Sequence, residues 1–136
     1  MSRQILIIDR DPDARLAMSM ALRHAGYKVS SVFDEEEALA LLDSSNGESP
    51  CFDLVIIDTG TPGAFGRRLA DALKHNVPAI PSLMVSNFSD KAFFIDLVSH
   101  GHREFIEKVC GKNEATMRIW DVNGKYTGKR TLHENG

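Results

Sequence analysis

The sequence predicts an α/β domain in which helices cover both faces of a doubly wound, five-stranded parallel sheet. Strand-like and helix-like segments alternate over the first ~110 residues, the pattern of such a sheet. Residues 5–8 and 54–57 are unbroken runs of Ile, Leu and Val, as strands buried on both faces require. Each run is followed by an acid, Asp9 or Asp58. The carboxyl ends of parallel strands share one edge, so these acids indicate a ligand site there.

Length and composition narrow the class of protein. A chain of 136 residues with 43% hydrophobic and 26% charged residues fits one globular domain. Its net charge of -3 provides no basic surface for nucleic acid. No apolar run reaches the ~18 residues of a membrane helix, and the start of the chain is no signal peptide. Cys51 and Cys110 are not expected to form a disulfide, and we expect a cytoplasmic protein.

The first half of the chain supplies two strands and two helices. After the strand at 5–9, Asp11 and Pro12 form an N-cap and first turn, and the helix stops near Gly26. Residues 27–32 alternate as a short strand. Asp34 and Glu37 then have the spacing of a capping box, which predicts a helix through residue 42.

The second half repeats the alternation. The strand ending at Asp58 is followed by a helix over roughly residues 66–75 and a strand within 77–86. A helix carrying Phe93 and Phe94 stops at Gly101, and residues 103–107 are predicted to form the fifth strand. Right-handed crossovers are expected throughout.

The last residues depart from the alternation of strands and helices. Residues 117–122 and 125–127 flank Asn123-Gly124, which predicts a hairpin with a tight turn. We therefore divide the chain into a domain of residues 1–112 and a tail of residues 113–136. The tail is a hairpin, an arm for a partner, or an arm for a homodimer; the sequence leaves these alternatives open.

Four polar residues fall at the predicted carboxyl ends of four strands: Asp9, Asp58, Ser86 and Lys108. Over about residues 3–109 this pattern resembles the receiver domain of two-component response regulators. The resemblance implies a flavodoxin-like fold with strand order 2-1-3-4-5. It also implies that Asp58 is the phosphoacceptor, modified by a sensor histidine kinase or a phosphotransfer protein.

The resemblance also assigns the other site residues. Asp9, Asp58 and the Gly60 carbonyl are hard oxygen ligands suited to Mg²⁺, the implied cofactor. Lys108 would contact a phosphoryl oxygen. Ser86 would shift toward the phosphate, and Phe105 stands where the family has an aromatic switch residue. The output would be a surface for a downstream protein, with no direct role for nucleic acid or membrane.

Three residues depart from the family pattern. Arg10 follows Asp9 where receivers usually carry a second acid, and it is predicted to pair with Asp9 or Asp58 and to weaken or replace Mg²⁺. Asn87 stands beside the phosphoryl pocket where the family has a very small residue. Val109 follows Lys108 in place of a proline, so Lys108 is expected to be displaced.

Three functions follow from this site. The leading hypothesis is a receiver whose phosphorylation at Asp58 shifts an interaction surface. The alternative is a pseudo-receiver that binds proteins without phosphoryl chemistry, with Arg10 in place of the cation. The third, a phosphatase of the haloacid dehalogenase type, needs a second acid two residues after Asp58, and that position is Gly60. We therefore predict that the protein is not an enzyme.

Overall fold

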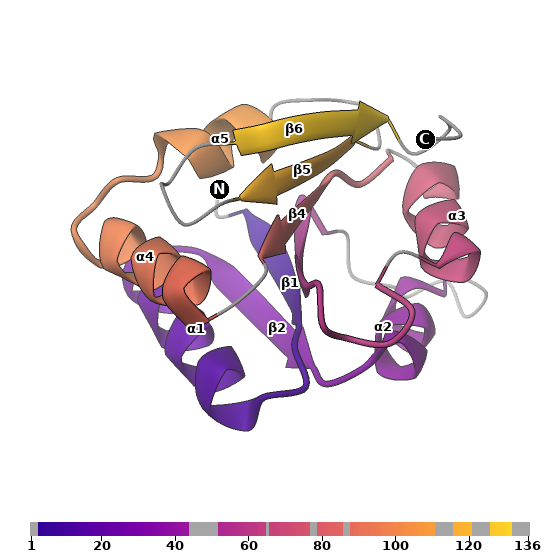
Figure 1. Cartoon of the computed structure of the whole chain (residues 1–136), viewed down its shortest axis with the longest axis horizontal. Helices are drawn as coiled ribbons and strands as arrows, with labels where there is room; N and C mark the ends of the chain where they lie inside the picture. The colour runs from indigo at the N-terminus through magenta and orange to yellow at the C-terminus, as the bar shows by residue number, and fades with distance from the viewer. Residues whose placement is uncertain are drawn as a thin grey trace.

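A computed structural model describes residues 3–43, 52–64, 66–76, 79–85 and 88–110, together with two strands at 116–120 and 126–131. Four strands form the parallel centre of the sheet: β1 (Gln4–Ile8), β2 (Lys28–Val32), β3 (Leu54–Asp58) and β4 (Ser82–Val85). With β5 (Thr116–Trp120) and β6 (Tyr126–Thr131), the full order is β2-β1-β3-β4-β5-β6 (Figure 1). The predicted α/β class and the central strands are confirmed. The register pairs Ile8 with Ile57 and Asp58 with Val85, so these strands end at one edge.

The predicted starts of the first two helices are confirmed. The Asp11 side chain accepts a hydrogen bond from the Asp13 backbone and caps α1 (Pro12–His24). The Asp34 side chain caps α2 (Glu35–Leu42) by accepting from Glu37 N, and Gly26 adopts φ +100° just after α1. No helix in the described part of the chain is long and apolar enough to span a membrane.

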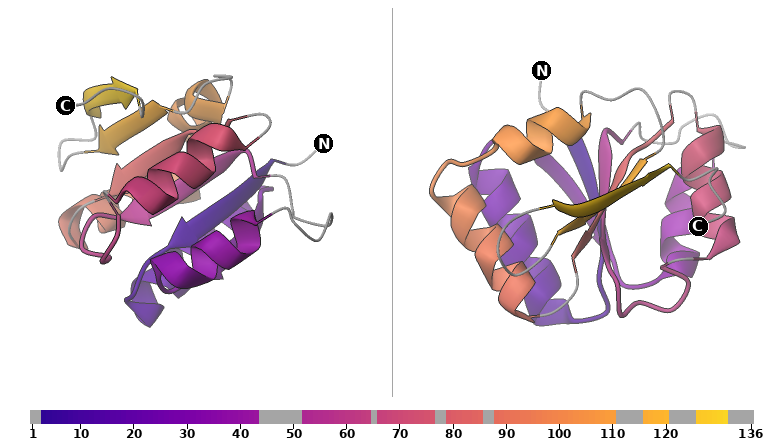
Figure 2. Two further views of the ribbon diagram at one scale, coloured as in Figure 1. Left: turned by 90° about the vertical axis from the view of Figure 1, so that its right-hand side faces the viewer. Right: turned by 45° about the horizontal axis from the view of Figure 1, so that its top comes forward.

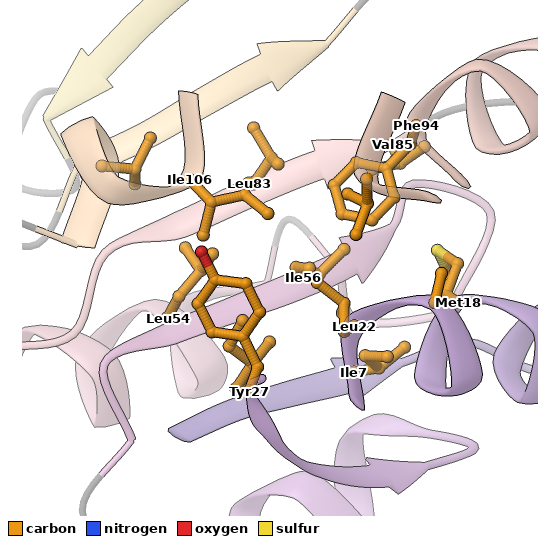
Figure 3. Packing of buried hydrophobic residues seen from close by; sticks show 14 of the residues in the cluster. Ile7, Met18, Leu22, Tyr27, Leu54, Ile56, Leu83, Val85, Phe94 and Ile106 are labelled. Carbon is orange, nitrogen blue, oxygen red and sulfur yellow. The ribbon is translucent and has the colours of Figure 1, made fainter. Parts of the chain in front are cut away.

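Helices cover both faces of the sheet (Figure 2, right). A hydrophobic cluster lies on each face. On one face lie α1, α4 (Phe88–Ser99) and α5 (Glu104–Cys110), and α1 packs against α4. Figure 3 shows Met18, Leu22, Phe94 and Ile106 of the helices in one cluster with Ile56, Leu83 and Val85 of the sheet. On the other face α2 and α3 (Arg67–His75) cover the alternate residues of the same strands. Each layer therefore fixes the sheet from one side.

The prediction of a fifth strand at residues 103–107 is wrong. This segment belongs to α5, because Ile106, Val109 and Cys110 follow the spacing of a helix and are all buried. The fifth strand of the sheet is β5 (Thr116–Trp120), which pairs in parallel with β4. A short apolar segment fits either periodicity, and burial of the helical face decides between them here.

The tail contributes to the sheet. β6 (Tyr126–Thr131) pairs antiparallel with β5 at the sheet edge, and the proposed turn at Asn123-Gly124 lies outside the described residues. The domain boundary at residue 112 stays a prediction, although the pairing of β5 with β4 crosses it. Cys110 is free and buried, and this burial raises the pKa of its thiol to about 12; Cys51 lies outside the described residues.

The expectation of uniformly right-handed crossovers is also wrong. From β3 to β4 and from β4 to β5 the chain moves in the same direction along the sheet. However, α3 lies on the α2 face, whereas α4 and α5 lie on the α1 face. The two crossovers therefore have opposite hands, against the strong general preference. The buried side chains of Phe94 and Val98 hold α4 on the α1 face.

A polar cluster fastens α5 at the amino edge of the sheet. The Glu107 carboxylate accepts hydrogen bonds from Arg3 Nε at 2.9 Å and from the Tyr27 hydroxyl at 2.7 Å. Burial of the Tyr27 hydroxyl and its bond to Glu107 raise the Tyr27 pKa. Burial acts to raise the Glu107 pKa, but the bonds from Tyr27 and Arg3 outweigh it and the pKa is lowered. Residues 3, 27 and 107 form what we call the amino-edge cluster.

Candidate functional site: an acidic pair at the carboxyl edge

Asp9 follows β1 directly and is fully buried. Its backbone N–H donates to Val32 O at 3.1 Å, which continues the ladder with β2. Its Oδ1 accepts a hydrogen bond from the Asp11 backbone at 2.9 Å, and its carbonyl accepts from the Arg15 guanidinium at 2.8 Å. The start of α1 therefore fixes this carboxylate, leaving Oδ2 directed to the site.

Asp58 is the last residue of β3, and its side chain is 13% exposed. The chain turns at once, because Thr61 N donates to the Asp58 carbonyl at 3.0 Å. A side chain at Gly60 would begin 3.3 Å from Asp58 Oδ2, so glycine leaves room for the carboxylate. The strand end and this turn present Asp58 beside Asp9, as the sequence predicts.

The cation between the two acids is Lys91, in the first turn of α4. Its Nζ lies 2.8 Å from Asp9 Oδ2 and 3.3 Å from Asp58 Oδ1, and its side chain is only 8% exposed. Lys91 is not among the site residues that the sequence predicts. The available signal was position: α4 follows β4, so its first turn begins at the edge where the acids lie.

Lys91 is held as a charged group. Burial of its ammonium acts to lower the pKa, but the hydrogen bond and charge of Asp9, with those of Asp58, outweigh burial and the pKa is raised. The exposed Phe88 ring lies with its centroid 5.8 Å from the same Nζ, within the range of a cation–π contact. The lysine is therefore a permanent positive charge in this pocket at neutral pH.

The loop after Asp58 is held by α2. Gly63 has φ +85°, and a Cβ on it would overlap the Glu35 carboxylate. Arg68 of α3 lies 3.7 Å from Glu35 and donates to Glu36 at 2.8 Å. The loop that shapes the rim of the site thus depends on the first turn of α2.

Two other predicted site residues, Lys108 and Phe105, lie on α5 rather than at this edge. Lys108 is exposed on α5, next to Glu107 of the amino-edge cluster, so the structure does not bring it to Asp58. Phe105 also lies on α5 and packs edge-on against Phe94, with ring centroids 5.6 Å apart. Ser86 and Asn87 lie outside the described residues, and their roles stay predictions.

Arg10 does not occupy the place expected of it. It is exposed and lines a surface pocket with the acidic first turn of α2, and it makes no ion pair with Asp9 or Asp58. Lys91 makes the ion pairs with both acids instead. Arg10 therefore takes no part in the contacts of Asp9 and Asp58.

The site as arranged does not fit a divalent cation. Two carboxylates converge, and no group of three or more His, Cys, Asp or Glu side chains arranged to hold a metal occurs among the described residues. An Mg²⁺ ion bonded to Asp9 Oδ2 would share that oxygen with Lys91 Nζ, which lies 2.8 Å from it, and charges of +2 and +1 about 4 Å apart repel by on the order of 8 kcal/mol at an effective dielectric constant of about 20. Mg²⁺ and Lys91 would therefore compete for the same Asp9 oxygen, and Mg²⁺ binding stays a prediction.

Comparison with known proteins gives one consistent result. The model of the response regulator receiver domain matches residues 5–119. The two-component response regulator-like protein APRR3 of Arabidopsis thaliana is 27% identical over 88% of the chain, which spans 24% of that protein. The transcriptional regulatory protein DctD for C4-dicarboxylate transport in Rhizobium meliloti is 32% identical over 76% of the chain, which spans 22% of it.

Solved structures show the same fold. The chemotaxis response regulator CheY4 of Vibrio cholerae aligns with 80% of the chain and 99% of its own, at a TM-score of 0.56 and 21% identity. A CheY-like receiver domain protein from Methanospirillum hungatei covers 83% of the chain at the same TM-score. The fold is thus the flavodoxin-like α/β fold with a parallel sheet.

Proposed function

Because the chain belongs to the response regulator receiver domain family, we propose that it accepts a phosphoryl group on Asp58 and thereby shifts a protein-interaction surface. The observation that supports this is the position of Asp58. It ends the central strand, remains partly open to solvent, and lies beside a second acid and a buried lysine. This is the expected setting for a carboxylate that must meet an incoming phosphoryl group.

In this proposal an Asp58 oxygen attacks the phosphorus while the bond from phosphorus to the donor breaks, and an acyl phosphate forms. The charge on the transferring oxygens requires a nearby cation. Lys91 provides it, since its Nζ lies 3.3 Å from Asp58 Oδ1. In this proposal Lys91 contacts the phosphoryl oxygen, the role that the sequence predicts for Lys108.

The output of this reaction would be carried by α4. Lys91 stands in its first turn, and Phe88, exposed by 76%, stands one turn before it at the protein surface. A new dianion on Asp58 changes the partners available to Lys91, and the first turn of α4 responds. The donors would be a sensor histidine kinase or a phosphotransfer protein, and a downstream protein would contact α4.

Intact mass measurement tests the proposal. The protein is incubated with acetyl phosphate, with and without MgCl₂, and an added HPO₃ group of about 80 Da is expected. Asp58→Asn should lose the adduct, whereas Asp96→Asn, which changes an exposed acid of α4, should keep it. A wild-type protein that gains no adduct under either condition would overturn the proposal.

A second function, that of a pseudo-receiver, is favoured by the same lysine. The Lys91 ammonium itself neutralises part of the charge of Asp9 and Asp58. The fold would then present α4 to a partner constitutively. Absence of both the phosphoryl adduct and beryllofluoride binding would select this function. In either case we expect no enzymatic turnover, because Gly60 stands where a phosphatase would need a general acid.

A further inference from the structure

We propose that Lys91 is a built-in counterion that keeps divalent cations out of the Asp9–Asp58 pair, so that a cation enters only when the first turn of α4 releases the lysine. The inference concerns cation binding alone. It does not depend on phosphorylation of Asp58.

The contacts of the ammonium support this role. Lys91 Nζ approaches one oxygen of each acid, at 2.8 Å and 3.3 Å, and the Phe88 ring lies on it as a third partner. Asp9 is 0% exposed and its other oxygen is held by the Asp11 backbone. The Asp9 oxygen that a cation would need is therefore the one that Lys91 uses.

The packing of α4 against α1 and the sheet keeps the Lys91 ammonium next to the two acids. The next turns of the helix bury Phe94 and Val98 against α1 and the sheet, at 0% and 2% exposure. Because α4 holds the ammonium near the acids, its contact with them costs no translational entropy. A free ion loses that entropy when it binds. A free cation must displace a partner that is always present.

This arrangement predicts a link between the pocket and α4. A cation that binds both acids repels the ammonium, and the first turn of α4 loses its anchor while the turns around Phe94 stay packed. The chain thereby couples the ionic state of the pocket to residues 88–91, among which Phe88 is already exposed.

Mg²⁺ titration tests the inference, followed by the amide NMR signals of residues 9, 58 and 60 with no phosphoryl donor present. Lys91→Met should bind Mg²⁺ roughly tenfold or more tightly than the wild type, because the competing charge is gone. Lys91→Arg should remain as weak as the wild type. Lys74→Met, which removes an exposed lysine of α3, should match the wild type.

Equal Mg²⁺ affinity in the wild type and Lys91→Met, or no binding by either, would overturn the inference. If Lys91→Met does not fold without Mg²⁺, its unfolding midpoint is measured against Mg²⁺ concentration. A midpoint that rises with Mg²⁺ supports the inference, because the ion then replaces the missing charge. A midpoint that stays constant contradicts it.

Discussion

The two edges of the sheet carry ion clusters of nearly equal geometry and very different burial. At the carboxyl edge Lys91 lies 2.8 Å from Asp9, with side chains 8% and 0% exposed. At the amino edge Arg3 lies 2.9 Å from Glu107, with side chains 36% and 46% exposed. The N···O distances of the two ion pairs are nearly the same, so the difference between them is burial. Water and salt can replace a lost partner only at the exposed amino edge.

The largest expected effect is at the carboxyl edge. Without Mg²⁺, Lys91→Met should lower the free energy of unfolding by about 3–5 kcal/mol, since it leaves a buried carboxylate without its cation. Urea unfolding measures this loss. Lys74→Met, the exposed counterpart, should change stability by less than about 0.5 kcal/mol. A Lys91→Met protein as stable as this control would remove the distinction between the two edges.

A smaller, pH-dependent effect is expected at the amino edge. The lowered Glu107 pKa means that its stabilisation is present above the ordinary value of 4.5 and is lost as the pH falls through the folded value. Glu107→Gln should cost about 1 kcal/mol at neutral pH and less in acid. Urea unfolding at several pH values measures the difference between variant and wild type. Glu104→Gln, an exposed change on the same helix, should show no such pH dependence.

The smallest effect concerns salt. Arg3→Gln should cost about 0.5 kcal/mol in dilute buffer and close to nothing in ~1 M NaCl, where exposed charges are screened. Unfolding at low and high salt gives both values. The cost of Lys91→Met should persist in NaCl, since its pair is shielded from solvent. If both costs disappeared together, the carboxyl-edge pair would behave as an exposed one.

The sequence predicted the features that depend on local pattern. The apolar strands that end at Asp9 and Asp58, the cap at Asp11 and the box of Asp34 with Glu37 each rest on a few adjacent residues. The approach of the two acids followed from the parallel pairing of their strands.

The sequence did not predict the features that depend on long-range packing. Residues 103–107 carry too few apolar positions to distinguish a strand from a helix, and the burial of Ile106 and Val109 in the core cluster decides for the helix. Lys91 appears in the sequence as an ordinary helix lysine. The start of α4 directly after β4 brings it to the acids, and the structure places it there instead of Arg10 or Lys108.

The contact of Gly63 with Glu35 has a consequence for engineering. The rim loop and the start of α2 are far apart in the chain, yet neither can be exchanged alone, because any side chain at position 63 would displace the carboxylate. A chimera that imports the 59–66 loop from a relative would have to import the matching residue at position 35 as well. The two segments are one transferable unit.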